Sequence, residues 1–242
     1  MNAGAEGLRG VEGLRGMEGL RSMEGLRSME GLRGVEGADG LNGLSSTAGY
    51  REAAEELAVQ YESVTFAEVH GDLLHCYPGP PAAVLDVGAG TGRDAAALAA
   101  LGHPVVAAEP TAELRAVGER LHAGSGVRWV ADALPGLPQL SAGAERFDLV
   151  LVTAVWMHLA PAERPLAMDA IGRLLAPGGR LALTLRHGPV PPGRRMFDIR
   201  PEETVALAAA RGLHLLHRTE RADLHGRADV RWTGLVFERA PC

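Results

Sequence analysis

The middle of the chain alternates short apolar runs with stretches of helical periodicity. The apolar runs, each bounded by turn residues, span 82–87, 104–108, 127–130, 147–153 and 180–186. Continuous runs of this length, rather than strict apolar–polar alternation, are typical of strands covered on both faces in a parallel sheet. Helical spacing predicts helices over 95–101, 111–122 and 165–175. Strands that alternate with helices predict right-handed crossovers and a doubly wound α/β sheet.

Two helices are expected before the first strand. Hydroxyl side chains at positions 45–47 offer N-caps for a helix that runs to about Tyr61. A second, short helix over 66–74 is stopped by a Pro-Gly-Pro-Pro cluster. Residues 47–77 are therefore expected to form a helical cap that precedes the sheet.

The last part of the chain predicts an antiparallel strand pair. A helix over 201–211 leads into two apolar runs, 213–219 and 231–238. The spacer 220–230 is too short and too polar for a crossover helix, so the two runs are expected to pair antiparallel at one sheet edge. The predicted fold is an α/β domain over 47–242, with a mostly parallel seven-stranded sheet that ends in this antiparallel pair.

A hexapeptide of the form Gly-Leu-Arg-Gly/Ser-Val/Met-Glu recurs from Gly7 to Glu36. A six-residue period rotates successive leucines by roughly 240° on a helix, so no apolar stripe forms. Glycine in every repeat weakens an extended strand, and so few repeats cannot stack the core of a β-helix. We expect residues 1–46 to be a disordered tail, with a short interaction segment as the alternative.

Composition and charge narrow the class of protein. The chain has 242 residues, 46% of them hydrophobic, and a formal net charge of −6. It can therefore hold one sizeable core, and it has no general attraction to nucleic acid or anionic membranes. Two cysteines, Cys76 and Cys242, are too few for a disulfide framework and unlike a metal site. Since no bilayer-spanning run or signal peptide is found, we expect a cytoplasmic monomer or homodimer without metal, membrane or nucleic-acid partner.

Acidic residues recur where three of the predicted strands end. Asp86, Glu109 and Asp132 follow the first, second and third strands at equal spacing. Ligands of an open parallel sheet bind beyond the carboxyl ends of its strands, so these carboxylates are expected at one rim. A rim of carboxylates repels phosphate and suits a cationic ligand that carries hydroxyl and amine donors. The glycine-rich turn from Gly88 to Gly92 lets the backbone approach such a ligand closely.

Five segments resemble, in order, the motifs of class I S-adenosylmethionine-dependent methyltransferases. They are DVGAGTGRD, VVAAEP, VADALP, FDLVLVTAVWMHL and RLLAPGGRLALTLR, one for each of the first five strands, and they cover about residues 82–186. The resemblance implies a Rossmann-like fold, a cofactor-binding core over 82–186, S-adenosylmethionine as the cofactor and methyl transfer as the activity. It says almost nothing about the methyl acceptor.

By that resemblance, the cofactor would be held by residues that follow the first four strands: Asp86, Gly88, Ala89, Gly90, Gly92, Glu109, Pro110, Asp132, Ala133, Thr153 and Ala154. The glycine turn would line the methionine moiety, with the first acid near its amino group. The second acid would hold the ribose and the third would meet the adenine. The pair Thr153–Ala154 would flank the sulfonium.

A dinucleotide-dependent oxidoreductase is the main alternative for a glycine-rich turn. Its fingerprint reads G-x-G-x-x-G, with the pyrophosphate at the helix N-terminus. Here the turn reads G-x-G-x-G and lies between Asp86 and Asp94. Two carboxylates beside a pyrophosphate would oppose the favourable field of the helix end, so we favour the sulfonium nucleoside.

The acceptor side carries weaker signals. A general base is needed only if the acceptor must lose a proton, and the candidates near the active rim are His158, His187 and Tyr61. We also consider His70 and Trp156 as candidates for contact with the acceptor. Each of these residues has an ordinary packing or surface interpretation as well.

The loop over 187–199 is the expected substrate loop. Together with the strand end before it, this loop presents Arg186, Arg194 and Arg195 among stiffening prolines, and arginine forks recognise carboxylate or phosphate. We therefore expect a small-molecule methyl acceptor that carries an anionic group, with a solvated basic loop as the plainer interpretation. Methylation of RNA or protein through residues 186–200 and a non-catalytic cofactor-binding module are the remaining alternatives.

Overall fold

A computed structural model describes residue 47 and residues 49–241 of the chain. The predicted disordered tail over 1–46, with two of the three candidate N-cap residues, lies outside the described residues. Among the helices of the described part, none has the length and apolar character needed to cross a membrane.

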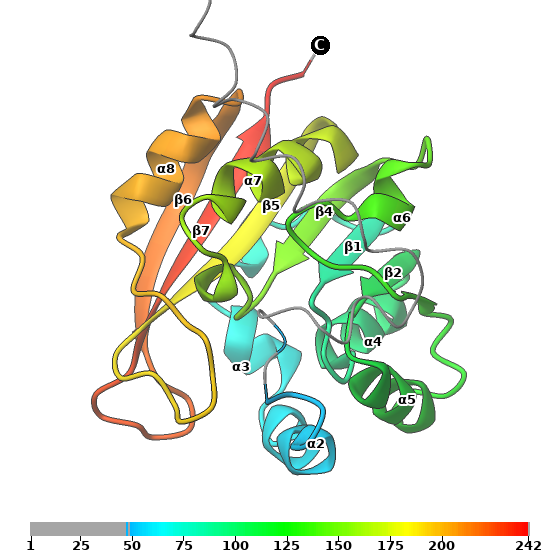
Figure 1. Cartoon of the computed structure of the whole chain (residues 1–242). Helices are drawn as coiled ribbons and strands as arrows, with labels where there is room; N and C mark the ends of the chain where they lie inside the picture. Colours follow the sequence, from blue (N-terminus) through cyan, green and yellow to red (C-terminus); the bar gives the residue numbers. More distant parts are fainter. Residues whose placement is uncertain (1–46, 48, 242) are drawn as a thin grey trace, which may run out of the picture. The chain divides into compact units, whose positions relative to one another are not determined.

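A seven-stranded sheet forms the centre of the domain (Figure 1). Its strands are β1 (Val84–Val87), β2 (Val105–Ala108), β3 (Arg128–Val130), β4 (Phe147–Val152), β5 (Leu175–His187), β6 (Leu213–Ala222) and β7 (Arg231–Arg239). They lie in the order β3-β2-β1-β4-β5-β7-β6. The first five strands are parallel, and β7 pairs antiparallel with both β5 and β6. This confirms the predicted doubly wound sheet and its C-terminal antiparallel pair.

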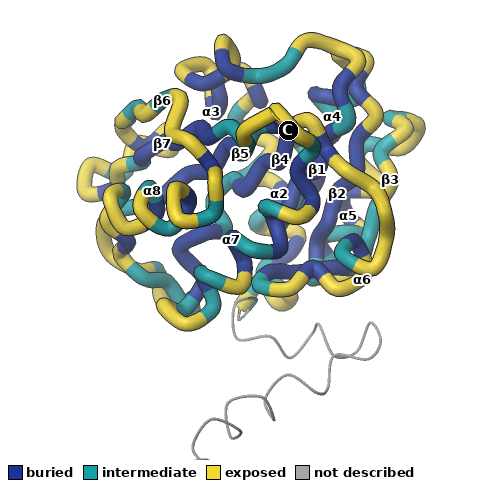
Figure 2. The backbone as a smooth tube through the Cα atoms, turned by 90° about the horizontal axis from the view of Figure 1, so that it is seen from above, coloured by how far each residue is buried: buried dark blue, intermediate teal, exposed yellow. Residues whose placement is uncertain are grey.

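Helices cover both faces of this sheet. They are α2 (Ala54–Glu62), α3 (Phe66–His70), α4 (Arg93–Ala100), α5 (Ala112–Leu121), α6 (Pro138–Ser141), α7 (Glu163–Leu174) and α8 (Pro201–Ala209), with the short 3-10 helices η3 (Leu74–Cys76) and η4 (Trp156–His158). Neighbouring strand residues enter two different hydrophobic clusters, since Leu85 packs with α7 and Val84 packs with α3 and α4. The central strands are therefore buried on both faces (Figure 2), which explains their continuous apolar runs.

The N-terminal helix begins later than the sequence predicts. Thr47 does not cap it, because α2 begins at Ala54 and its N-cap residue Ala53 makes no side-chain capping bond. Gly49 has a φ of 75°, in the left-handed region, and a helix from Thr47 cannot continue through that conformation. The prediction was therefore wrong about the start of this helix and right about its end.

Strand β6 contains an irregularity that the apolar pattern did not reveal. Leu215 is opposite Phe237 on β7, whereas His217 is opposite Val236. Two steps along β6 thus match one step along β7, which makes Leu216 the extra residue of a β-bulge. A bulge reverses which face of the sheet the following side chains occupy.

Candidate active site

A cavity of about 380 Å³ lies at the carboxyl ends of β1, β2 and β4. Open α/β sheets bind their ligands at this edge, and the volume is within the roughly 300–1,000 Å³ usual for small-ligand sites. The lining combines the turn after β1 with the N-terminal cap, the loop after β5 and the β6–β7 hairpin. Most of the predicted cofactor residues line it: Asp86, Gly88, Ala89, Gly90, Glu109, Pro110, Ala133, Thr153 and Ala154.

The glycine turn after β1 is shaped by close contacts. Gly88 has a φ of 69°, and a Cβ atom on it would lie 2.4 Å from Cγ2 of Val155. The amides of Gly88 and Ala89 both donate to the carbonyl of Ala108 on β2, at 2.7 and 3.1 Å. This turn therefore needs glycine at position 88 and exposes bare backbone to the cavity.

Glu109 is a buried acid that joins two parts of the site. Its Oε2 accepts the amide of Gly90 at 2.9 Å, and its Oε1 accepts the amide of Thr111 at 2.8 Å. Burial raises the pKa of Glu109, while these two backbone hydrogen bonds act in the opposite direction. The carboxylate is thus held in a fixed position at the cavity wall, with remaining lone pairs available to hydroxyl donors.

Asp86 has an unused hydrogen-bonding atom. Its Oδ2 is shielded from solvent and has no hydrogen-bond partner within the part of the chain that the structure describes. Burial raises the pKa of Asp86 well above its ordinary value, and the nearby carboxylate of Asp94 raises it further, while Arg93 acts in the opposite direction. A buried acceptor without a donor is costly, so this side of the cavity suits a cationic donor such as an ammonium group.

Two predicted cofactor residues lie outside the lining of the cavity. The carboxylate of Asp132 accepts the amides of Ala133 and Leu140, at 3.0 and 2.9 Å, and so orders the loop after β3. Gly92 packs against the ring of Trp129, where a Cβ atom would lie 2.6 Å from that ring. Ala133 and its neighbour Leu134 face the cavity instead, and the roles predicted for Asp132 and Gly92 stay predictions.

A hydrogen-bonded pair, Tyr50 and His158, lies in the lining of the cavity. The Tyr50 hydroxyl is 2.9 Å from Nε2 of His158, and Nδ1 of His158 is 2.7 Å from the carbonyl oxygen of Arg195. A carbonyl can only accept, so Nδ1 carries the proton, and Nε2 of the neutral ring accepts the proton of Tyr50. Burial lowers the pKa of His158, which favours this neutral form, although the Arg195 carbonyl opposes the shift.

Tyr50 was missed because it lies in the turn that the sequence interpretation assigned to a helix. Burial raises the pKa of its phenol, and the guanidinium of Arg194, 3.7 Å from the ring centre, opposes that rise. The predicted residue Tyr61 also lines the cavity. Burial raises the pKa of Tyr61, and the neighbouring Tyr50 adds to the effect.

The arginines predicted for the acceptor separate into two groups. Arg186 and Arg194 line the cavity, and the structure adds Arg221 and Arg227 from the β6–β7 hairpin. Arg195 is directed elsewhere, since its guanidinium pairs with Glu163 and donates to the carbonyl of His158. The sequence interpretation missed the hairpin arginines because it treated residues 220–230 only as a spacer.

Three further candidates lie outside the lining. His70 is 1% exposed and bonds to Oδ2 of Asp94 at 2.8 Å, so it stands behind that cavity residue. His187 bonds to Asp198 and to Thr233, and Trp156 is a fully buried core residue. None of the three lines the cavity, and their predicted roles at the acceptor stay predictions.

Comparison with known proteins relates part of this chain to methyltransferases. Residues 84–179 match a family model described as a methyltransferase domain. A demethylmenaquinone methyltransferase of Clavibacter sepedonicus is 37% identical over 119 residues, which cover 48% of this chain and 46% of that protein. The match therefore spans just under half the length of that relative.

Solved methyltransferases share the fold. The 1,6-didemethyltoxoflavin N1-methyltransferase of Burkholderia thailandensis, with 1,6-didemethyltoxoflavin and S-adenosylhomocysteine bound, has a TM-score of 0.56 and 25% identity, covering 72% of this chain and 76% of that one. Magnesium protoporphyrin IX methyltransferase of Synechocystis PCC 6803, with bound S-adenosylhomocysteine, has a TM-score of 0.58 and 16% identity, covering 72% and 81%. The second likeness concerns the fold alone.

The strand order and the match over residues 84–179 identify a Rossmann-like methyltransferase domain. The chain carries a class I S-adenosylmethionine-dependent methyltransferase domain. This confirms the resemblance drawn from the sequence motifs and sets aside the dinucleotide alternative.

Proposed function

We propose that this protein transfers a methyl group from S-adenosylmethionine to a small-molecule acceptor that bears an acidic group. The observation that carries the proposal is the division of one cavity into an acidic and a basic end. Asp86 and Glu109 line it at the ends of β1 and β2, where Arg93 is paired with Asp94. Arg186, Arg221 and Arg227 line it at the β5 and hairpin side, where Asp223 is paired with Arg227.

The acidic end has the donor and acceptor pattern that the methyl donor requires. Bound S-adenosylmethionine supplies an ammonium group, a ribose diol and a methyl group activated by a sulfonium. Asp86 would accept from the ammonium through its unpartnered Oδ2, and Glu109 would accept from the diol. The bare backbone at Gly88 leaves room for close approach, and the hydrophobic Ala133 and Leu134 provide an apolar wall.

Tyr50 lines the cavity. Burial raises the pKa of its phenol, the charges of Arg194 and Arg186 lower it, and the charge of Glu109 raises it. Where the methylated atom carries a proton, that proton passes to the Tyr50 oxygen as the hydroxyl proton of Tyr50 passes to Nε2 of His158. The Arg195 carbonyl holds the imidazole in the tautomer that can receive it. The pair is therefore suited to general-base catalysis.

The basic end supports an acidic acceptor of small size. Arg194 stacks on Tyr50, and Arg227 holds Asp223 through a 2.7 Å ion pair, so both guanidinium groups are positioned by their neighbours. Arg195 faces Glu163 instead of joining a continuous basic surface. This arrangement favours a compact carboxylate or phosphate acceptor over RNA or a protein chain.

Two measurements test the proposal. Calorimetric titration with S-adenosylmethionine, S-adenosylhomocysteine and NADH should show binding of the first two only. An acceptor would then be identified with isotope-labelled methyl donor across metabolite, RNA and protein pools. We expect label in an acidic metabolite; label only in RNA or protein would contradict the small-molecule assignment.

Once an acceptor has been identified, the variants Arg186→Ala and Arg194→Ala test whether the basic end of the cavity binds it. Loss of a charge-assisted hydrogen bond costs about 1.5–3 kcal/mol, so KM for the acceptor should rise roughly 10- to 150-fold. The control is Arg200→Ala, because Arg200 is exposed and lies outside the cavity lining. Unchanged KM values in both cavity variants would remove the anionic-acceptor assignment while leaving methyl transfer itself intact.

A further inference from the structure

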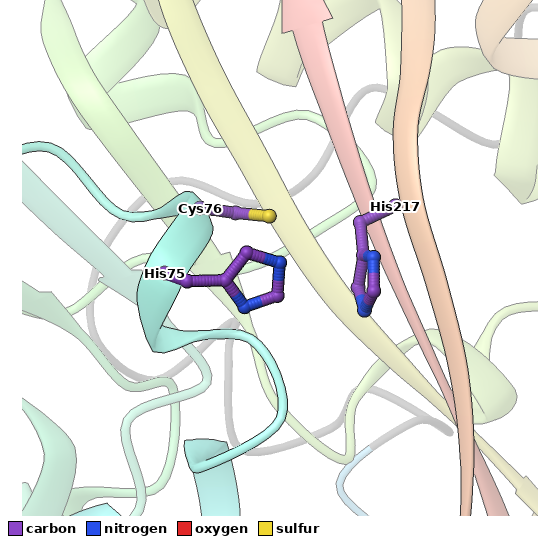
Figure 3. Close-up of side chains that lie close together, drawn as sticks. All are labelled: His75, Cys76 and His217. Carbon is purple, nitrogen blue, oxygen red and sulfur yellow. The ribbon is translucent and has the colours of Figure 1, made fainter.

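Two histidines and a cysteine from distant parts of the chain meet on the α3 side of the sheet. His75 and Cys76 belong to η3, and His217 belongs to β6. Their candidate ligand atoms all lie within 4.8 Å of one another. Figure 3 shows the Cys76 thiol and the His75 ring extending toward the ring of His217. None of the three lines the candidate active site, so their proximity is not explained by the proposed function.

The bulge in β6 brings His217 to this position. Before the bulge, Leu215 is opposite Phe237, which belongs to the hydrophobic cluster on the α7 face. After it, His217 is opposite Val236, which shares a cluster with Cys76 on the α3 face. Paired residues of antiparallel strands point to the same face, so strict alternation from Leu215 would have placed His217 on the α7 face. The extra residue turns the imidazole toward the thiol.

The cysteine is held in place from both sides of its backbone. Its amide donates to the carbonyl of Leu73 at 2.8 Å, and its carbonyl accepts from the Arg180 guanidinium at 2.5 Å. Its side chain is buried, whereas His75 is exposed and His217 half-buried. Cys76 is therefore fixed within the protein, whereas the exposed His75 can adjust its position at the surface.

The chemistry of the three ligands selects a class of ion. A thiolate and two imidazoles are the borderline-soft donors that suit zinc and related divalent transition metals. Tetrahedral bond lengths of about 2.3 Å to sulfur and 2.0–2.1 Å to nitrogen place neighbouring ligand atoms roughly 3.3–3.6 Å apart. The upper limit of 4.8 Å on the separations is about 1.2–1.5 Å wider than this, so the side chains must move closer together to bind an ion, and the exposed His75 and the half-buried His217 have the most freedom to do so.

We propose that His75, Cys76 and His217 bind one zinc-class divalent metal ion, with water as the fourth ligand. The ion would connect η3, at the end of the N-terminal cap, to the strand that leads into the β6–β7 hairpin. Both the cap and the hairpin supply lining residues of the cavity. The sequence led us to expect no metal, because it could not show that two histidines join Cys76.

The site can be tested on the untagged full chain with Cys242 replaced by Ser, which leaves Cys76 as the one thiol. Titration with Co²⁺ should give one ion per chain and a thiolate-to-cobalt charge-transfer absorption, which Zn²⁺ then displaces. Added Zn²⁺ should also slow alkylation of the Cys76 thiol. This second readout needs no change in the site, so it remains decisive if a site variant fails to fold.

Variants assign the ligands. His75→Ala and His217→Ala should weaken binding by at least ~10- to 100-fold, the loss that even an outer-shell partner can cause. His214→Ala is the matched control, because His214 lies on the same strand and is exposed. Absence of the charge-transfer band, an alkylation rate that Zn²⁺ leaves unchanged, or equal loss of binding in His214→Ala would each overturn the proposal. Binding of S-adenosylmethionine, measured separately, reports on the methyltransferase site alone.

Discussion

Replacing Asp86 by Asn should stabilise the free protein and weaken binding of the methyl donor. Asp86 is 2% exposed, and its Oδ2 lacks a partner among the described residues. A buried polar group left unsatisfied costs about 1–3 kcal/mol, and more when it is charged. The amide of Asn has nearly the same shape and still leaves a polar atom at this position, but it carries no charge. Only the part of the cost that belongs to the buried charge is removed, so the free energy of unfolding should rise by an amount at the lower end of that range.

The sign of the pH dependence follows from the direction of the pKa shift. The pKa of Asp86 is raised in the folded protein, first by burial and then by Asp94. The carboxyl group therefore favours folding while it is protonated and becomes unfavourable as pH rises through its raised pKa. We expect the stability advantage of Asp86→Asn to be small below the ordinary carboxyl pKa, to grow as pH rises above it, and to level off once pH exceeds the raised pKa of the folded protein.

Thermal unfolding with and without ligand measures both effects. Each kcal/mol should raise the melting temperature by about 2–4 °C for a domain of this size. Loss of the charge-assisted bond to the donor's ammonium should weaken binding by about 1.5–3 kcal/mol, roughly 10- to 150-fold. With saturating S-adenosylmethionine the wild type should therefore gain more stability than the variant. The exposed Glu119→Gln change is the charge-matched control.

The reasoning is refuted if Asp86→Asn lowers the melting temperature of the free protein, or if the variant binds S-adenosylmethionine as tightly as the wild type. The first result would mean that the carboxylate is already well accommodated in the free protein. The second would mean that the ammonium lies elsewhere.

Three other predictions address the remaining parts of the site. Tyr50→Phe should lower kcat by roughly 10²–10⁴-fold if the acceptor loses a proton to this residue. The double variant with His158→Ala should lower kcat only a little further, because the two residues act as one unit. If the two losses of kcat were additive, the residues would act independently. Burial lowers the pKa of His158. In a plot of kcat against pH, the loss of activity on the acid side should therefore occur below the pH range in which histidines ordinarily titrate. A loss within that ordinary range would contradict this expectation. Gly88→Ala should abolish donor binding and lower the melting temperature, since its Cβ would lie 2.4 Å from Val155 at a positive φ. Calorimetry measures the binding and thermal unfolding measures the stability. Near-normal binding would show that the turn can change its conformation to accept a side chain.

The end of the cavity that we propose for the cofactor could largely be located from the sequence, because it depends on local and repeated features. Apolar runs locate the strands, and an acid after each run is placed at the carboxyl edge by the parallel topology alone. This reasoning put Asp86 and Glu109 in the cavity. It did not distinguish an acid that lines the cavity from an acid that orders a loop. Asp132 is of the second kind, because its carboxylate accepts backbone amides of the loop after β3.

The acceptor end depends on tertiary contacts that leave no local signal. Tyr50 reaches His158 only because the chain turns at Gly49, and His70 and His187 are engaged by Asp94 and Asp198 from elsewhere in the sequence. From the sequence alone, each histidine is an equally good candidate for contact with a ligand. The difference between a ligand-facing and a partnered side chain is set by the elements packed against it.

The origin of the two ends of the cavity has a consequence for engineering. The residues proposed to face the donor come mainly from one continuous stretch, 86–134. The residues proposed to face the acceptor come from a turn before the first helix, from β5 and the loop after it, and from a hairpin near the C-terminus. Exchanging the hairpin segment 222–230 for that of another homologue should therefore redirect substrate choice without rebuilding the donor pocket. A fold organised in this way can acquire new acceptors by replacing peripheral segments.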